Sequence, residues 1–104
     1  MKIIDKSNLV DTIKSGVAVL DFWAAWCGPC KMLMPVMEEV QSEIGGRAIF
    51  GKVNVDDNPA IADEYKVSVI PSVFILKDGK IVDKFVGLKK KEYIVSIIEK
   101  AFID

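Results

Sequence analysis

Two cysteines separated by two residues are the side chains in this sequence with the clearest capacity for chemistry. They are Cys27 and Cys30, in the segment WCGPCK at positions 26–31. A Cys-x-x-Cys pair at the start of a helix can alternate between a dithiol and a disulfide. The chain has no other cysteine and no histidine. Thiol–disulfide exchange is therefore the first reaction to consider.

The predicted start of a helix makes the two thiols unequal. Cys27 falls at the N-cap position, Gly28 and Pro29 in the first turn, and Cys30 at the third helical position. Because Pro29 has no amide hydrogen, the backbone N–H of Cys30 is the main candidate donor to the Cys27 sulfur. This bond and the helix dipole both favour a thiolate, so we expect Cys27 to be an exposed nucleophile with a lowered pKa. Cys30, one turn further in, is expected to be the shielded, resolving thiol.

Two other roles for the cysteines stay open. A purely structural disulfide would close a loop of about four residues, which removes only about 2 kcal/mol of unfolded-chain entropy. Alternatively, the pair could supply half of an intermolecular zinc or iron–sulfur site, because a structural zinc ion needs about four Cys or His ligands. The missing histidine excludes nucleophile activation of the Ser-His or Cys-His kind.

Asp21 is the second unusual residue, because it stands in an otherwise apolar run from Val17 to Trp23. Alternate positions on both faces of this predicted strand are apolar, so desolvation should raise the pKa of Asp21. In a chain without histidine, Asp21 is the best-placed group to accept the Cys30 proton, through a water molecule. A local cap at the strand end is the alternative. Lys52 is either the partner of this charge or an edge-strand lysine with its amine in solvent.

The elements that position these residues alternate between helices and strands. Predicted helices cover residues 8–14, 28–44, 59–65 and 89–102, and predicted strands cover 17–23, 48–55, 72–77 and 80–86, with a further short strand at 2–4. Asn8 and Asn58 are candidate N-caps, and Asp78-Gly79 is a hairpin signal. Helical crossovers imply parallel strands, and the hairpin adds an antiparallel pair. We therefore predict one α/β domain over residues 1–104, with a mixed sheet of four to five strands and helices on both faces.

The composition limits the classes of partner and the cellular location that we expect. The chain has 104 residues, 51% of them hydrophobic, and a net charge of -1. Nucleic-acid-binding proteins carry a clear basic excess, which is missing here. The apolar runs are far shorter than the roughly 20 residues that cross a bilayer, and charged Asp5 and Lys6 follow the first four residues, so no signal peptide is expected. We expect a cytoplasmic protein that binds neither nucleic acid nor membrane.

The sequence resembles the thioredoxin family. The resemblance rests on WCGPCK at positions 26–31, on the strand end DFWA at 21–24, and on Ile70-Pro71 before a strand, and it covers essentially the whole chain. It implies the thioredoxin fold, with four helices around the central sheet. It also implies a general protein-disulfide reductase that uses a redox-active Cys27–Cys30 disulfide. The dipeptide between the cysteines lacks the histidine of oxidising relatives, so the chain looks like the reductase branch.

The resemblance also implies roles for individual residues. Cys27 would attack, Cys30 would resolve, Asp21 would transfer the proton and Lys52 would be its neighbour. Three further residues would tune the active site, namely Gly28, Pro29 and a cis Pro71. The cis bond would turn the Ile70 backbone toward an extended substrate peptide. The apolar docking surface would comprise Trp26, Gly28, Pro29, Val69, Ile70 and Gly87, with core packing or turn geometry as the alternative for Val69 and Gly87.

The implied partners are disulfide-containing proteins and a separate thioredoxin reductase that regenerates the dithiol. The resemblance implies a monomer without a bound cofactor or metal, and it leaves NADPH and ferredoxin equally open as the electron source. Two other functions stay as alternatives. One is a thioredoxin-like binding subunit of a larger complex whose redox activity is incidental, and the other is the intermolecular metal site.

Overall fold

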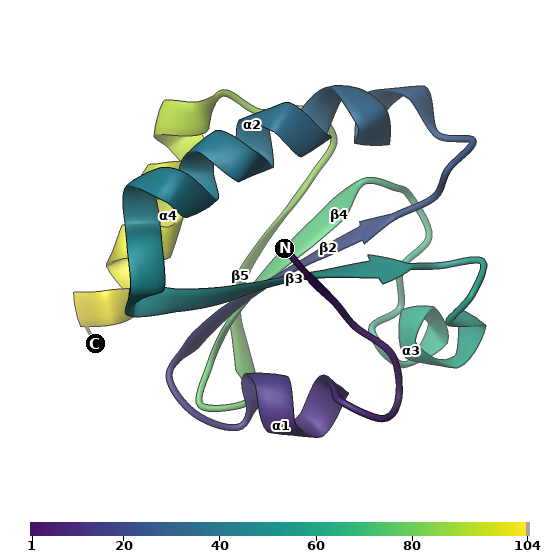
Figure 1. Cartoon of the computed structure of the whole chain (residues 1–104), viewed down its shortest axis with the longest axis horizontal. Coiled ribbons are helices and arrows are strands. Elements are labelled where there is room, and N and C mark those ends of the chain that lie inside the picture. The colour runs from purple at the N-terminus through teal and green to yellow at the C-terminus, as the bar shows by residue number, and fades with distance from the viewer. Residues whose placement is uncertain (104) are drawn as a thin grey trace.

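A mixed sheet forms the centre of the protein, whose computed structural model describes residues 1–103 (Figure 1). Within these residues the sheet has five strands in the order β1-β3-β2-β4-β5. They are β1 (Lys2–Ile3), β2 (Val17–Trp23), β3 (Ala48–Asn54), β4 (Ser72–Lys77) and β5 (Lys80–Val86). The first three in space run parallel, and β4 is antiparallel to both β2 and β5. The predicted mixed sheet is confirmed.

Helices cover both faces of this sheet, as predicted. They are α1 (Leu9–Ile13), α2 (Gly28–Ile44), α3 (Pro59–Glu64) and α4 (Lys91–Ile103), and a 3-10 turn (Gly45–Arg47) follows α2. In Figure 1, α2 and α4 lie on one side of the sheet and α1 and α3 on the other. No helix within residues 1–103 is both long and apolar enough to cross a membrane.

Strand β2 is buried on both faces, which explains its nearly continuous apolar sequence. Its residues Val17 and Val19 join a core cluster with α2 and α4, whereas Ala18, Leu20 and Phe22 join a second cluster on the α1 and α3 side. Side chains of a strand alternate between faces, so Asp21 shares the α2 face with Val17 and Val19. The central strand therefore brings one carboxylate into an apolar layer.

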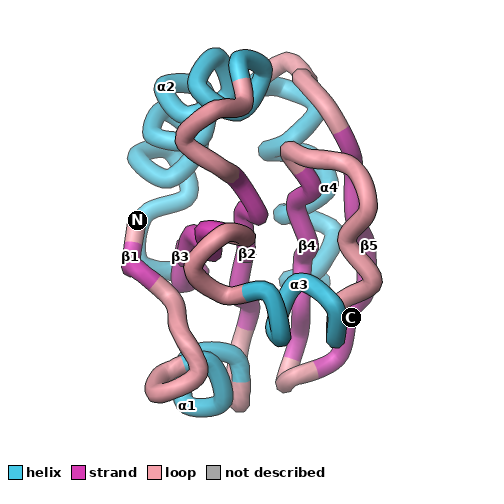
Figure 2. Tube along the Cα trace, turned by 90° about the vertical axis from the view of Figure 1, so that its right-hand side faces the viewer, coloured by secondary structure: helices cyan, strands magenta, loops and turns pink. Residues whose placement is uncertain are grey.

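The loops that matter for function meet at one edge of the sheet. Parallel strands β2 and β3 end there, and antiparallel β4 begins there. Figure 2 views this edge, with the loops after β2 and β3 and the loop before β4 toward the viewer. The carboxyl ends of parallel strands are the usual place for a site in an α/β sheet.

One predicted helix start and two predicted side-chain caps need correction. Helix α4 begins at Lys91 and not at Lys89, so Lys89 and Lys90 lie before the helix, because each further lysine in the first turn would oppose the helix dipole. The charge of Lys91 is balanced by Glu43 of α2, whose Oε1 lies 3.4 Å from the Lys91 Nζ. Asn8 and Asn58 precede α1 and α3 but make no side-chain cap. The Asn8 Oδ1 accepts from the Asp5 N–H, and the Asn58 Nδ2 donates to the Asn54 carbonyl, so both side chains order the preceding loop.

Candidate active site

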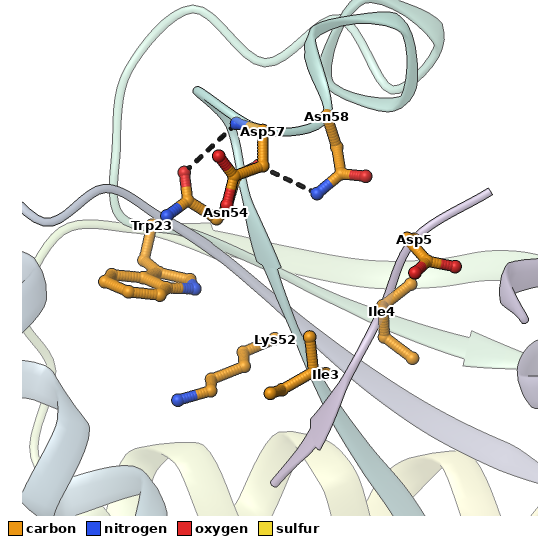
Figure 3. A pocket seen from close by; sticks show the side chains of 8 residues that line it. All are labelled: Ile3, Ile4, Asp5, Trp23, Lys52, Asn54, Asp57 and Asn58. Atoms are coloured by element: carbon orange, nitrogen blue, oxygen red, sulfur yellow. Dashed lines mark hydrogen bonds between the residues drawn. The ribbon is translucent and has the colours of Figure 1, made fainter. Parts of the chain in front are cut away.

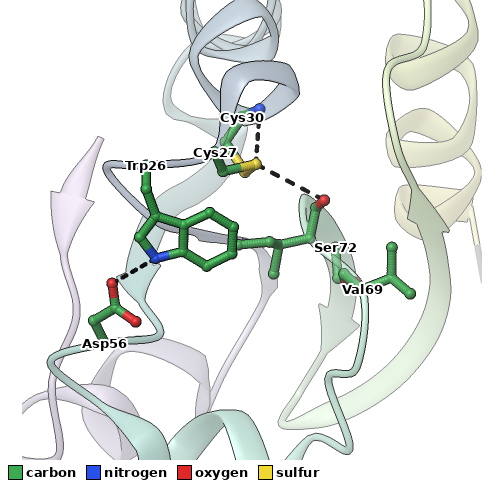
Figure 4. The surroundings of a disulfide bond; sticks show 7 residues. Trp26, Cys27, Cys30, Asp56, Val69 and Ser72 are labelled. Carbon is green, nitrogen blue, oxygen red and sulfur yellow. Dashed lines mark hydrogen bonds between the residues drawn. A yellow bond between two sulfur atoms is a disulfide. The ribbon is translucent and has the colours of Figure 1, made fainter.

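The two cysteines lie at the start of α2 and form a disulfide (Figure 4). Cys27 is the N-cap with extended backbone angles, and its Sγ accepts a hydrogen bond of 3.2 Å from the Cys30 backbone N–H. This is the donor that the missing amide of Pro29 predicts, and it is confirmed. The helix that follows is 17 residues long, so the positive end of its dipole is directed at the Cys27 sulfur.

The prediction that Cys27 is exposed is wrong for this disulfide form. Cys27 is 5% exposed and Cys30 is 1% exposed, so the expected order holds but both residues are buried. They pack with Ala24 in a small cluster, against which Trp23, Val55 and Ile70 are partly buried. Part of this cover comes from Val55 and Ile70, two residues distant in sequence, which is why the local pattern around WCGPC does not reveal it.

Asp21 is 1% exposed, and neither of its carboxylate oxygens has a hydrogen-bond partner among residues 1–103. Burial raises the pKa of Asp21 to about 7 from its ordinary value of 3.8, and the nearby Lys52 ammonium opposes part of that rise. The direction agrees with the desolvation argument made from the sequence. An unpartnered buried carboxylate that titrates near neutral pH is able to take up and release a proton.

Lys52 lies opposite Asp21 in the register of β2 and β3. Strand β3 is not an edge strand, because β1 pairs with it on its other side, so the edge-strand alternative is wrong. Lys52 is half-buried, and its Nζ lies 5.3 Å from the centroid of the Trp23 ring. Figure 3 shows both side chains among the residues lining a pocket, which are Ile3, Ile4, Asp5, Trp23, Lys52, Asn54, Asp57 and Asn58.

The loop before β4 lies directly beside the disulfide. The Ile70-Pro71 peptide bond is cis, as the family resemblance implies. The carbonyl oxygen of Ile70 is 3.9 Å from the Cys27 Sγ, and the Ser72 hydroxyl donates to the Val69 carbonyl within the same loop (Figure 4). Gly87 reaches the same place from the end of β5, because its N–H donates to the Pro71 carbonyl at 2.9 Å. Its φ of 84° is a conformation that favours glycine.

The apolar residues expected to form a docking surface differ in their exposure. Trp26 is 70% exposed and Val69 57%, and Gly28 and Pro29 are exposed as well. Ile70 is half-buried, because its side chain packs against both the cysteine cluster and the α1 and α3 core. Core packing is therefore excluded as the role of Val69, whereas Ile70 contributes partly to the core.

Two polar residues at this edge are missing from the sequence-based predictions. The indole N–H of Trp26 donates to Asp56 in the loop after β3, and the side chain of Asn54 accepts from the backbone N–H of Asp56. The signal that could have found them is topological. Loops after two parallel neighbouring strands meet at one edge, so an acidic residue after β3 comes close to the aromatic residue after β2.

The same residues offer little to a metal ion. Among residues 1–103, no three His, Cys, Asp or Glu side chains gather in a group that could hold one. The described cysteine sulfurs bond to each other. The geometry is thus that of a covalent redox pair at a helix N-terminus.

Comparison with known proteins gives one consistent result. The family model described as Thioredoxin matches residues 1–100. A thioredoxin of Staphylococcus saprophyticus is 48% identical over 100 residues, which cover 96% of this chain and 95% of that protein. A thioredoxin of Chlamydia caviae is 45% identical over 100 residues, covering 96% of this chain and 97% of that protein.

A solved structure agrees with these sequence matches. A mutant thioredoxin from Halobacterium salinarum NRC-1 superposes with a TM-score of 0.89 at 33% identity, covering 96% of this chain and 88% of that one. The family model covers nearly the whole chain and the curated relatives are 45–48% identical to it, so the chain belongs to the thioredoxin family.

Proposed function

We propose that the chain reduces disulfides in other proteins, with Cys27 as the attacking thiolate and Cys30 as the resolving thiol. Membership of the thioredoxin family and the closed cysteine pair support thiol–disulfide reductase function. The observation that carries the assignment of roles is the hydrogen bond from the Cys30 N–H to the Cys27 Sγ. Once the disulfide is reduced, this bond and the helix dipole favour a thiolate on Cys27 over one on Cys30.

The proposed reaction has two displacements. First, the Cys27 thiolate attacks one sulfur of a substrate disulfide, forms a mixed disulfide, and releases the other substrate sulfur as a thiolate that takes a proton. Second, Cys30 loses its proton and attacks the Cys27 sulfur, which forms the Cys27–Cys30 disulfide and releases the remaining substrate thiolate. Two electrons pass from the cysteine pair to the substrate, and the substrate ends as a dithiol.

Asp21 is the proposed acceptor of the Cys30 proton. Its oxygens have no hydrogen-bond partner within residues 1–103, which leaves them able to accept from a water molecule that bridges toward the start of α2. A group with a pKa of about 7 accepts and returns a proton efficiently at neutral pH. Lys52 has the proposed role of moderating that pKa, because its ammonium favours the ionised carboxylate.

Substrate binding in this proposal uses the exposed apolar residues around the disulfide. An extended peptide would contact Trp26, Pro29 and Val69, and would pair with the backbone of Ile70 beside Cys27. Gly28, Pro71 and Gly87 would shape this surface by keeping the backbone close to the sulfur. A small apolar surface with backbone pairing recognises many unfolded or extended segments, which suits a general reductase.

The proposal includes a separate reductase that returns two electrons to the Cys27–Cys30 disulfide, and a cytoplasmic location where such a dithiol persists. In this proposal the chain works as a monomer and without a bound cofactor. Assays with an NADPH-dependent and with a ferredoxin-dependent thioredoxin reductase would identify the electron donor, since only the matching enzyme should reduce the chain with turnover.

Insulin reduction tests the proposed function. With dithiothreitol as the electron source, the chain should accelerate the precipitation of insulin chains catalytically. Absence of turnover by the folded protein would refute the reductase proposal and favour a binding subunit. Metal analysis and sedimentation of the anaerobically prepared protein address the other alternative, which requires a dimer that contains metal.

A further inference from the structure

Trp26 is highly exposed, yet its ring is held by a charged hydrogen bond. The indole is 70% exposed, and its Nε1–H donates to a carboxylate oxygen of Asp56 at 2.9 Å (Figure 4). The two residues lie 30 positions apart, on the loops after β2 and β3. An exposed tryptophan without such a partner can change rotamer freely, so this contact selects one orientation of the ring beside Cys27.

The backbone of Asp56 is itself held in place by Asn54, the last residue of β3. The Oδ1 of Asn54 accepts from the backbone N–H of Asp56 at 2.9 Å, and the Asn54 carbonyl accepts from the backbone N–H of Asn58 at 3.0 Å. The next residue, Val55, donates its N–H to the Trp23 carbonyl at 2.9 Å. The loop that presents Asp56 is therefore anchored to the ends of both parallel strands.

We propose that Asp56, positioned by Asn54, fixes the indole of Trp26 in the orientation that receives a substrate protein beside Cys27. This inference rests on the proposed function and names positioning residues for it. Fixing a large side chain before binding removes an entropic cost worth about a two- to tenfold change in affinity. The benefit applies only to substrates large enough to contact the indole, because a small disulfide needs only the sulfur of Cys27.

Asp56 has a charge as well as a hydrogen bond, and the two effects are separable. Asp56→Asn keeps a side-chain oxygen that accepts from the indole but removes the charge. Asp56→Ala removes both. Asp57→Ala is the matched control, because Asp57 is the next residue, equally acidic and exposed. Positioning predicts that the alanine and asparagine variants of Asp56 behave differently.

The first measurement is reduction of two substrates by each variant. With insulin, Asp56→Ala should lower kcat/KM about three- to tenfold, mostly through a higher KM, while Asp56→Asn and Asp57→Ala stay within about twofold of the parent chain. With a small disulfide such as hydroxyethyl disulfide, all three variants should match the parent. A loss that appears with both substrates would mean that Asp56 acts on the cysteines, which would overturn the proposal.

The second measurement reports on the ring itself. In a ¹⁵N–¹H spectrum the indole signal of Trp26, assigned through Trp26→Phe, should move and gain fast motion in Asp56→Ala, with the Trp23 signal unchanged. Asn54→Ala should give the same change, and Asn54→Asp should restore the parent signal because its carboxylate still accepts from the Asp56 N–H.

Two results would overturn the inference while leaving the reductase function intact. One is full insulin activity and an unchanged indole signal in Asp56→Ala. The other is an equal loss in Asp56→Asn and Asp56→Ala, which would assign the effect to charge. Failure of the proposed function is distinct from both, because the parent chain itself would then show no insulin turnover.

Discussion

Asp21 and Phe22 are neighbours in β2, yet they face opposite sides of the sheet and meet opposite environments. Phe22 is completely buried, and its ring centroid lies 5.3 Å from those of both Tyr65 and Phe74. Asp21 is as deeply buried on the α2 side, where its oxygens have no partner among residues 1–103. At this end of the strand, one face thus packs the Phe22 ring against two other aromatic rings, and the other face contains a carboxylate that is costly to bury.

This contrast shows how the fold separates stability from reactivity. Burial of an unpaired carboxyl group costs free energy, and the protein retains it on the face that leads into α2 and the cysteines. Apolar packing around the strand, in clusters on both sides of the sheet, offsets this cost. We therefore expect substitution of Asp21 to change the rate of exchange and the pH dependence of stability, and substitution of Phe22 to change the free energy of unfolding but not the rate.

The largest expected effect comes from replacing the sulfur of Cys30 with the oxygen of serine. Cys30→Ser should stop turnover and accumulate a stable mixed disulfide between Cys27 and a substrate protein, because serine cannot displace the second bond. Non-reducing electrophoresis and mass spectrometry measure the adduct, which dithiothreitol should release. Cys27→Ser is the matched control and should form no adduct. Accumulation of an adduct on Cys27→Ser would reverse the roles of the two cysteines.

The next effect concerns the opposite face. Phe22→Ala should lower the free energy of unfolding by about 3–5 kcal/mol, since it leaves a cavity between two aromatic rings. Exchange by the folded fraction should stay within about twofold of the parent. Urea unfolding and insulin reduction measure the two quantities, and Phe22→Leu provides a milder variant if the alanine chain does not fold. A selective loss of exchange in folded Phe22→Leu would contradict the separation of the two faces.

The contrast between the environments of Asp21 and Phe22 was predictable from the sequence only in part. Local rules were enough for the apolar run of β2, the Asp78-Gly79 hairpin and the N-cap position of Cys27, because each depends on residues a few positions apart. They also identified Asp21 as a charge among apolar neighbours. These features point to Cys27, the proposed nucleophile, and to the carboxylate of Asp21 before any tertiary contact is known.

Contacts between distant segments were not predictable from residue patterns. Two nearly uniform apolar strands do not reveal their register, which places Lys52 opposite Asp21. The burial of Cys27 depends on Ile70, and Trp26 is held by a carboxylate from another loop. The cis form of Ile70-Pro71 was implied by family resemblance, since an X-Pro bond is cis in only about 5–6% of cases.

A substitution at Asp21 should change both rate and stability. Asp21→Asn should slow resolution of the mixed disulfide about tenfold or more at pH 7, since the amide accepts no proton. Single-turnover reduction of insulin measures this rate. An unchanged rate would remove Asp21 from the proton transfer and leave that role to solvent.

Stability should change in the opposite direction. The pKa of Asp21 is about 7 in the folded chain and near 3.8 in the unfolded chain, so between these values the folded state binds more protons. The stability that Asp21 contributes is present below pH 4 and is lost as the pH rises through 7, at about 1.4 kcal/mol per unit. Asp21→Asn should therefore match the parent near pH 4 and be more stable at pH 8, as urea unfolding at both pH values would show.

The smallest expected effect tests whether the charge of Lys52 on β3 lowers the pKa of Asp21 on β2. Lys52 lies across from Asp21 and lowers its pKa, so Lys52→Met should raise that pKa above about 7. The midpoint of the pH–rate profile for resolution should move upward by up to about one unit, because fewer Asp21 side chains are ionised at a given pH. An NMR titration of the Asp21 carboxyl carbon measures the same shift directly.

The control for this variant is Lys100→Met, which removes an equal charge from an exposed site in the last turn of α4. It should leave the midpoint unchanged, since charges separated by solvent are screened. If Lys52→Met also leaves it unchanged, the Asp21 pKa is set by desolvation alone and Lys52 has no part in the chemistry. A downward shift would contradict the direction of the electrostatic effect. An upward shift of the midpoint would mean that the pKa of Asp21, and with it the proposed proton transfer, depends on the charge of Lys52 on the neighbouring strand.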